Sequence, residues 1–254
     1  KGMSKAEKKA GRIAAEGLTR VAAQGNHAVI FEVNSETDFV AKNEQFLHVL
    51  DVLQASLLES KPASLEEALK VSTPEGTVEE VITNATATIG EKISFRRIDV
   101  VEKKDDEIFG TYMHMGGKIS AVVVLKGTQD AQIAKNIAMQ VASMSPVYVS
   151  QSEIPSDVVE HERKLQMQMM QNDPKMAGKP EKVLQGILKG KVDKHFKDLC
   201  LNDQEYFLEP KQKVSQFLKE NGAEAVCFVR YQAGEGIEKK EENFAEEVMS
   251  QIKG

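Results

Sequence analysis

The strongest constraint on the fold is a pattern that occurs twice, 93 residues apart. Ala28–Phe31 aligns with Ala121–Val124 as an apolar strand, and Val40–Asn43 aligns with Ile133–Asn136 at a helix, without a gap. Self-similarity at a fixed spacing indicates a repeated architecture. We therefore interpret the chain as two related subdomains. Chance similarity between two strand–turn–helix units is the alternative.

The two copies differ at the turn between strand and helix. The first copy has Thr37-Asp38-Phe39 where the second has Asp130-Ala131-Gln132. Because the second copy is built without an aromatic residue, the fold does not require one, and Phe39 becomes a candidate for function on a rigidly held turn. From the pattern alone, the alternative is a core residue that packs on Phe46, or a hydrophobic staple.

Local patterns predict the elements around the repeat. Apolar residues at intervals of three and four indicate a helix over 43–58, and Gly25-Asn26 indicates a hairpin. Ser64 with Glu67, and Thr77 with Glu80, are typical of helix N-caps. The predicted helices are 3–16, 43–58, 65–70, 77–89, 130–143 and 214–220, and the predicted strands are 18–23, 27–33, 93–101, 108–115, 118–125 and 223–231.

The region from Ser156 to Leu199 has a different character. Two amphipathic helices joined by a short Pro/Gly turn predict an antiparallel helical hairpin that packs on itself and projects from the core. A last amphipathic helix is expected over 241–252. The fold class is thus α+β, with two related subdomains of antiparallel strands and packed helices, a hairpin and a C-terminal helix. We predict five regions: 1–16 as a linker helix, 17–107 as one subdomain, 108–150 with 203–238 as the other, 151–202 as the hairpin, and 239–254 as a C-terminal helical module.

Composition excludes several classes of protein. The net charge is −6 with a pI of about 5.6. Proteins that bind nucleic acid through nonspecific charge attraction have basic surfaces, so this charge argues against such binding. No apolar run approaches the ~20 residues that a membrane span requires. Cys200 and Cys227 are surrounded by apolar residues in the sequence. We interpret them as free thiols in the core of a protein from a reducing compartment. We therefore expect a cytoplasmic protein that binds neither membranes nor nucleic acid directly.

The motifs of catalytic and cofactor sites are missing. Gly117-Lys118-Ile119-Ser120 imitates only the tail of a phosphate-binding loop and opens a strand, so we reject it. The five histidines show no metal-ligand spacing; His161 and His195 could approach each other across the hairpin, but packed or solvated histidines are the simpler interpretation. No nucleophile–base set is suggested. We expect no catalytic residues, no metal and no cofactor.

Several further segments carry a resemblance to a known family. They are Lys8–Gly17, Glu32–Phe39, Thr37–Asn43, Ile89–Ile93, Ile137–Met139, Gly178–Pro180, Val229–Tyr231 and Gly234–Lys239. Together they resemble the bacterial translation elongation factor Ts family, in its low-GC Gram-positive form, over essentially the whole chain. Gln140 departs from the pattern, because many relatives carry His there. The family's N-terminal helical domain is expected to be absent except for its tail.

The resemblance implies a function and a set of contact residues. The family exchanges guanine nucleotides on elongation factor Tu, a GTPase. Asp38 and Phe39, with Val40 and Ala41, are implied to enter the GTPase and disturb its Mg²⁺ site. Further contacts are implied at Thr37, Ile89, Gly90, His114, Phe207 and Leu208. Some relatives use the part that matches the hairpin for self-association, which raises the option of a homodimer. The alternative function is a scaffold module that binds through the hairpin.

Overall fold

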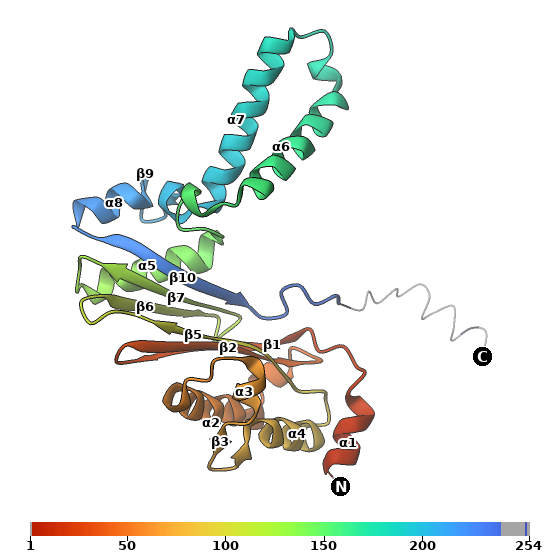
Figure 1. The fold of residues 1–254 in the computed structure, drawn as a ribbon. Coiled ribbons are helices and arrows are strands. Elements are labelled where there is room, and N and C mark those ends of the chain that lie inside the picture. Colours follow the sequence, from red (N-terminus) through yellow and green to blue (C-terminus); the bar gives the residue numbers. More distant parts are fainter. Residues whose placement is uncertain (1, 240–251, 253–254) are drawn as a thin grey trace. The chain divides into compact units, whose positions relative to one another are not determined.

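A computed structural model describes residues 2–239 and 252. These residues form two compact units (Figure 1): one contains 2–102, 113–120 and 231–239, and the other contains 103–112 and 121–230. Their helices and antiparallel strands confirm the predicted α+β class. Within the described residues, no helix is long and apolar enough to span a membrane. The helix predicted over 241–252 lies outside them, except for Ile252.

The first unit is built on a three-stranded antiparallel sheet with strand order β1-β2-β5. Helices α2 and α4 lie against one face of this sheet (Figure 1). Its elements are α1 Gly2–Lys9, β1 Glu16–Gln24, β2 His27–Ser35, the 3-10 helix η1 Val40–Lys42, α2 Glu44–Ser60, α3 Leu65–Leu69, β3 Ser72–Thr73, β4 Gly76–Thr77, α4 Val78–Ile89 and β5 Ser94–Glu102.

The N-terminal helix is shorter than predicted. The helix expected over 3–16 ends at Lys9, and β1 already begins at Glu16. Gly17 has φ +123°, and a Cβ atom there would lie 2.2 Å from the Val33 carbonyl oxygen. This close approach of two strands requires glycine, and Glu16 and Gly17 are already paired with Ser35 and Asn34 of β2. The predicted hairpin itself is confirmed, with Gln24 paired to His27.

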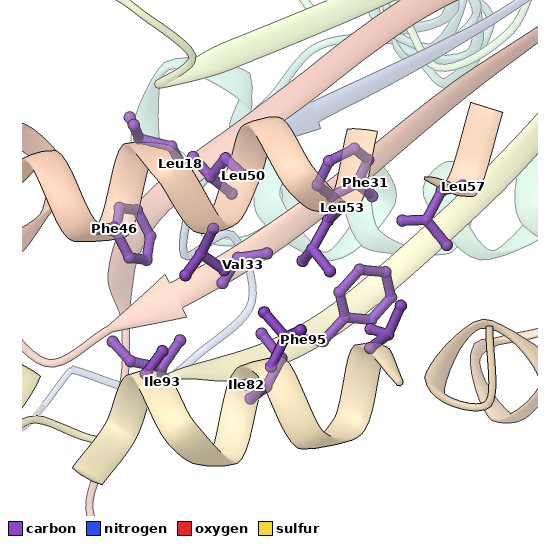
Figure 2. Close-up of a cluster of buried hydrophobic side chains, with 14 of the residues drawn as sticks. Leu18, Phe31, Val33, Phe46, Leu50, Leu53, Leu57, Ile82, Ile93 and Phe95 are labelled. Atoms are coloured by element: carbon purple, nitrogen blue, oxygen red, sulfur yellow. The ribbon is translucent and has the colours of Figure 1, made fainter. Parts of the chain in front are cut away.

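The core of this unit lies between the sheet and its helices, as Figure 2 shows. The predicted apolar stripe of α2 is entirely buried. It packs with Phe31 and Phe95 of the sheet, whose rings stack at a centroid distance of 5.8 Å. Burial of each such side chain stabilises the fold by ~1.5–3 kcal/mol. The stripe consists of Phe46, Val49, Leu50, Leu53 and Leu57.

Side-chain caps define where the helices begin. The Asn43 side-chain carbonyl accepts from the backbone N–H groups of Gln45 and Phe46 at the start of α2. Thr77 and Glu80 form the predicted capping box of α4, and Gly90 ends that helix with φ +86°. Such caps satisfy N–H and C=O groups that have no partner within the helix. They also fix the point where residues 38–43 lead into α2 and the point where the chain leaves α4 at Gly90.

A buried carboxylate ties three segments of the unit together. Glu32 on β2 is fully buried and accepts from Arg97 Nε at 2.6 Å, from Arg96 Nη1 at 3.2 Å and from Gly234 N at 2.7 Å. Consecutive strand residues normally face opposite sides. A register shift in the β2–β5 pairing, beside Glu32, allows both arginines to reach one carboxylate. Arg97 also covers the Tyr231 ring, at 4.0 Å from its centroid.

A second three-stranded sheet has strand order β10-β7-β6. In both sheets the central strand is the second strand of a hairpin, leads into a helical segment, and pairs with a strand that follows the helices. This shared order agrees with two related subdomains. The elements are β6 Ile108–His114, β7 Ile119–Lys126, α5 Ala131–Met144, η2 Gln151–Glu153, α6 Ser156–Gln171, η3 Pro174–Met176, α7 Glu181–Leu199, η4 Leu201–Asp203, β8 Glu205–Tyr206, β9 Glu209–Lys213, α8 Val214–Glu220 and β10 Glu224–Gln232.

Helices α6 and α7 form the predicted hairpin (Figure 1). They share a small apolar cluster of their own, which contains Met170, Leu188, Val192 and Phe196. His195 pairs with Glu162 of the facing helix at 3.6 Å. The hairpin therefore packs on itself, as its narrow apolar stripes predict.

Candidate functional site

Phe39 lies in solvent. Its exposed fraction is 86%, whereas Phe46 at the start of α2 is fully buried. The alternative of a core residue packed on Phe46 is therefore wrong. Large aromatic side chains gain most of their stabilisation from burial, so Phe39 contributes little to the stability of the free chain. The segment Thr37–Ala41 is called the Asp38–Phe39 turn below.

The residues after Phe39 anchor the turn. Val40 and Ala41 are buried and belong to the core of the first unit. The carbonyl groups of Asp38 and Phe39 each accept an N–H three residues later, at 3.2 Å, which makes a short 3-10 helix. Of the four residues that the resemblance assigns to the contact, Asp38 and Phe39 are exposed, and Val40 and Ala41 hold them in place.

Thr37 joins the turn to the end of α4. Its backbone N–H and its hydroxyl donate to the two carboxylate oxygens of Glu91, at 2.9 and 2.7 Å. Glu91 directly follows Gly90, which is exposed, and Ile89, which is half-buried against the core. The structure therefore brings two of the further predicted contacts, Ile89 and Gly90, close to the Asp38–Phe39 turn, which itself contains Thr37.

An ion pair joins the turn to a second loop. Lys118 Nζ donates a hydrogen bond to the Asp38 carboxylate. This bond is the main reason that the pKa of Asp38 lies below its usual value. Lys118 ends the segment Met113–Lys118, called the Met115 turn below. In this turn the His114 carbonyl accepts from Gly117 N at 3.1 Å and Lys118 N at 3.0 Å. The exposed His114 thus belongs to the same end of the first unit.

Phe207 and Leu208 belong to the second unit. Leu208 is exposed, and the half-buried Phe207 packs edge-on against Tyr206 with a centroid distance of 5.6 Å. The backbone N–H of Phe207 donates to Gln140 Oε1 at 2.9 Å. Gln140, a departure from the pattern of the resembled family, is thus the buried residue that positions Phe207.

Sequence reasoning missed Glu91 and Lys118 as parts of the site. They meet Thr37 and Asp38 across 54 and 80 residues of sequence. In the sequence, Lys118 stands out only as the tail of a false phosphate-binding motif, and Gly117-Lys118 do lead into β7. In the part of the chain that the structure describes, no group of three or more His, Cys, Asp or Glu side chains could hold a metal ion.

Removing the Lys118 charge tests the joint between the two turns. Lys118→Met is expected to lower the free energy of unfolding by less than about 1 kcal/mol, because the pair is accessible to solvent. Asp38 has its pKa lowered in the folded chain, so the pair stabilises above the unfolded pKa and this contribution is lost as pH falls through the folded pKa. Urea unfolding from neutral to acid pH should show the difference from the parent shrinking. Lys118→Arg, which keeps the charge, is the control; a difference that persists at acid pH would contradict the assignment.

A comparison with known protein families gives a match over most of the chain. The model of the family described as Elongation factor TS matches residues 36–235. The match begins directly before the Asp38–Phe39 turn, after β1 and β2, and continues through β5, the second sheet and the hairpin to Glu235.

Proposed function

Because the chain belongs to the elongation factor Ts family, we propose that it acts in translation elongation as the guanine nucleotide exchange factor of the GTPase Tu. The observation that carries this proposal is Phe39, which is exposed on a turn whose neighbours on both sides are anchored. A large apolar side chain on an anchored backbone is suited to binding a partner, since little backbone entropy is lost on docking. The role in translation also implies a cytoplasmic location.

Phe39 acts as a wedge between side chains of Tu. Burial of a phenylalanine supplies ~1.5–3 kcal/mol, which is available to hold Tu in a conformation with a disturbed nucleotide site. Asp38 enters beside it and shifts the segments of Tu that hold Mg²⁺. Because Mg²⁺ requires near-ideal octahedral coordination, a small displacement weakens the binding of both the ion and the diphosphate.

Exchange then follows from thermodynamic linkage. If the chain binds nucleotide-free Tu more tightly than Tu·GDP, it must weaken GDP binding by the same factor. No bond of the nucleotide changes, so the chain acts as a binding protein rather than as a catalyst. Contacts at Thr37, Ile89, Gly90 and His114 surround the wedge, and Phe207 with Leu208 adds a contact from the second unit.

The direct test is the release of a fluorescent GDP analogue from Tu. The chain is expected to accelerate release at substoichiometric concentrations, because an exchange factor leaves each Tu molecule after GTP binds. A second measurement, without added GTP, should show a stable complex of the chain with nucleotide-free Tu. Release at the spontaneous rate in the presence of excess chain would overturn the proposal.

The alternative is a scaffold that binds its partner through the hairpin. Leu165, Met169 and Val183 are exposed apolar residues on α6 and α7, which leaves surface for a partner or for self-association. This alternative predicts that the hairpin is essential for binding, whereas the exchange proposal locates the essential residues on the Asp38–Phe39 turn.

Deleting the hairpin distinguishes the two functions. Replacing residues 158–196 with a short Gly/Ser linker keeps Leu199, whose carbonyl accepts from Val147 N at 2.8 Å and from Tyr148 N at 3.1 Å. The hairpin has its own apolar cluster, so its loss should spare the rest of the fold. We expect stimulated GDP release to remain within about threefold of the parent. Loss of Tu binding by a folded deletion variant would favour the scaffold, and light scattering would show whether a dimer is lost.

A further inference from the structure

Met115 has two features that are unfavourable for the stability of the free chain. Its side chain has an exposed fraction of 73%, so it gains little from burial in the free chain. Its backbone has φ +51°, in the left-handed region. Side chains other than those of glycine, asparagine and aspartate rarely adopt this region because the Cβ atom is crowded. An exposed, strained position on a tight turn would ordinarily favour asparagine or glycine.

The rest of the turn shows why Met115 is held in this conformation. Gly116 and Gly117 follow with φ +71° and +116°. A Cβ atom at Gly117 would lie 2.4 Å from the carbonyl oxygen of Thr19. Thr19 donates to the Gly117 carbonyl oxygen through both its backbone N–H and its hydroxyl, at 2.7 Å each. The turn is thus fastened to β1, and Met115 is held out into solvent by its surroundings. Residues kept in such conformations occur at binding and catalytic sites.

The turn lies next to the proposed wedge. Lys118, at its end, donates to the Asp38 carboxylate, and Asp38 directly precedes Phe39. The side chain of Met113, on the same turn, is also exposed. Methionine is flexible and polarisable, so it adapts to an apolar partner surface of irregular shape. Two adjacent turns therefore carry exposed apolar side chains that have no role in the core.

We propose that Met115 is a second apolar contact with the GTPase surface that Phe39 enters. This inference rests on the proposed function. The partner surface is an apolar depression beside the site of the Phe39 wedge, and Met115 reaches it as an adaptable contact while Phe39 supplies the rigid one. The strain at Met115 is tolerated because the residue serves the complex rather than the free chain.

The test separates binding from folding, because the two should respond in opposite directions. Met115→Asn removes the apolar contact but suits left-handed backbone. We expect the concentration of chain needed for half-maximal GDP release to rise about five- to tenfold, while the Tm stays equal or increases. Met115→Leu should recover most of the lost activity, since it restores the apolar side chain. Met144→Gln, at an exposed methionine at the end of α5, is the control for a general loss of apolar surface.

Each outcome decides a separate point. If Met115→Asn exchanges like the parent while Phe39→Ala is impaired, this inference is overturned and the proposed function stands. If neither variant is impaired, the proposed function fails and this inference fails with it. If Met115→Asn lowers the Tm along with activity, or if Met115→Leu fails to recover activity, Met115 is a structural residue and the inference is overturned.

Discussion

Phe39→Ala is expected to slow the stimulated release of GDP from Tu by about ten- to a hundredfold, which corresponds to losing the burial of one phenylalanine side chain. The Tm should not fall, because Phe39 is 86% exposed in the free chain. Asp38→Ala should act in the same direction. Stopped-flow release of fluorescent GDP, with circular dichroism melting of each variant, measures both quantities.

Two control variants separate a loss of stability from a loss of exchange activity. Phe46→Ala, at the buried phenylalanine of α2, should cost about 3–5 kcal/mol of unfolding free energy through the cavity it creates. Leu165→Ala, at an exposed apolar residue of the hairpin, should change neither exchange nor stability. If the double variant of Asp38 and Phe39 still accelerates GDP release fully, the wedge mechanism is wrong.

Glu32→Ala is expected to lower the free energy of unfolding by about 3–5 kcal/mol, because it leaves buried donors without their acceptor. The carboxylate is fully buried and accepts from Arg96, Arg97, Asn34 and Gly234. Arg96 and Arg97 are partly exposed and can recover some hydration, which favours the lower end of this range. Urea unfolding of the parent and the variant measures the difference.

The matched control for this variant is Glu102→Ala. Glu102 ends β5 and is exposed, so its loss should change the unfolding free energy by less than about 0.5 kcal/mol. Glu32→Gln should remain destabilising, since its amide group would direct a donor at the arginines. A cost below about 1 kcal/mol for Glu32→Ala would show that the network is dispensable.

Elements with strong local patterns could be predicted closely. The stripe of α2, the Thr77–Glu80 capping box and the Gly25-Asn26 hairpin turn each depend on residues close together in sequence. The N-terminal helix is the exception. Its pattern continues to residue 16, but the helix ends at Lys9, and Glu16 and Gly17 belong to β1, which pairs with β2 through the close approach at Gly17.

The candidate site, too, could be predicted only in part from the sequence. The difference between the two repeats is enough to single out Phe39, because the fold of the second copy does without an aromatic residue there. Periodicity does not decide whether Phe39 is buried. That depends on Val40 and Ala41, the next residues, which enter the core and leave Phe39 in solvent.

Order along the chain is sufficient to predict two strand–turn–helix units, a helical hairpin and an acid–aromatic turn, because these depend on contacts between near neighbours. The partners of that turn are decided by tertiary structure. Glu91 and Lys118 reach it across 54 and 80 residues, and Glu32 gathers two adjacent arginines only because the strand register shifts beside it. Such contacts leave no local signal, since they arise when packing of the core brings distant loops to one end of a unit.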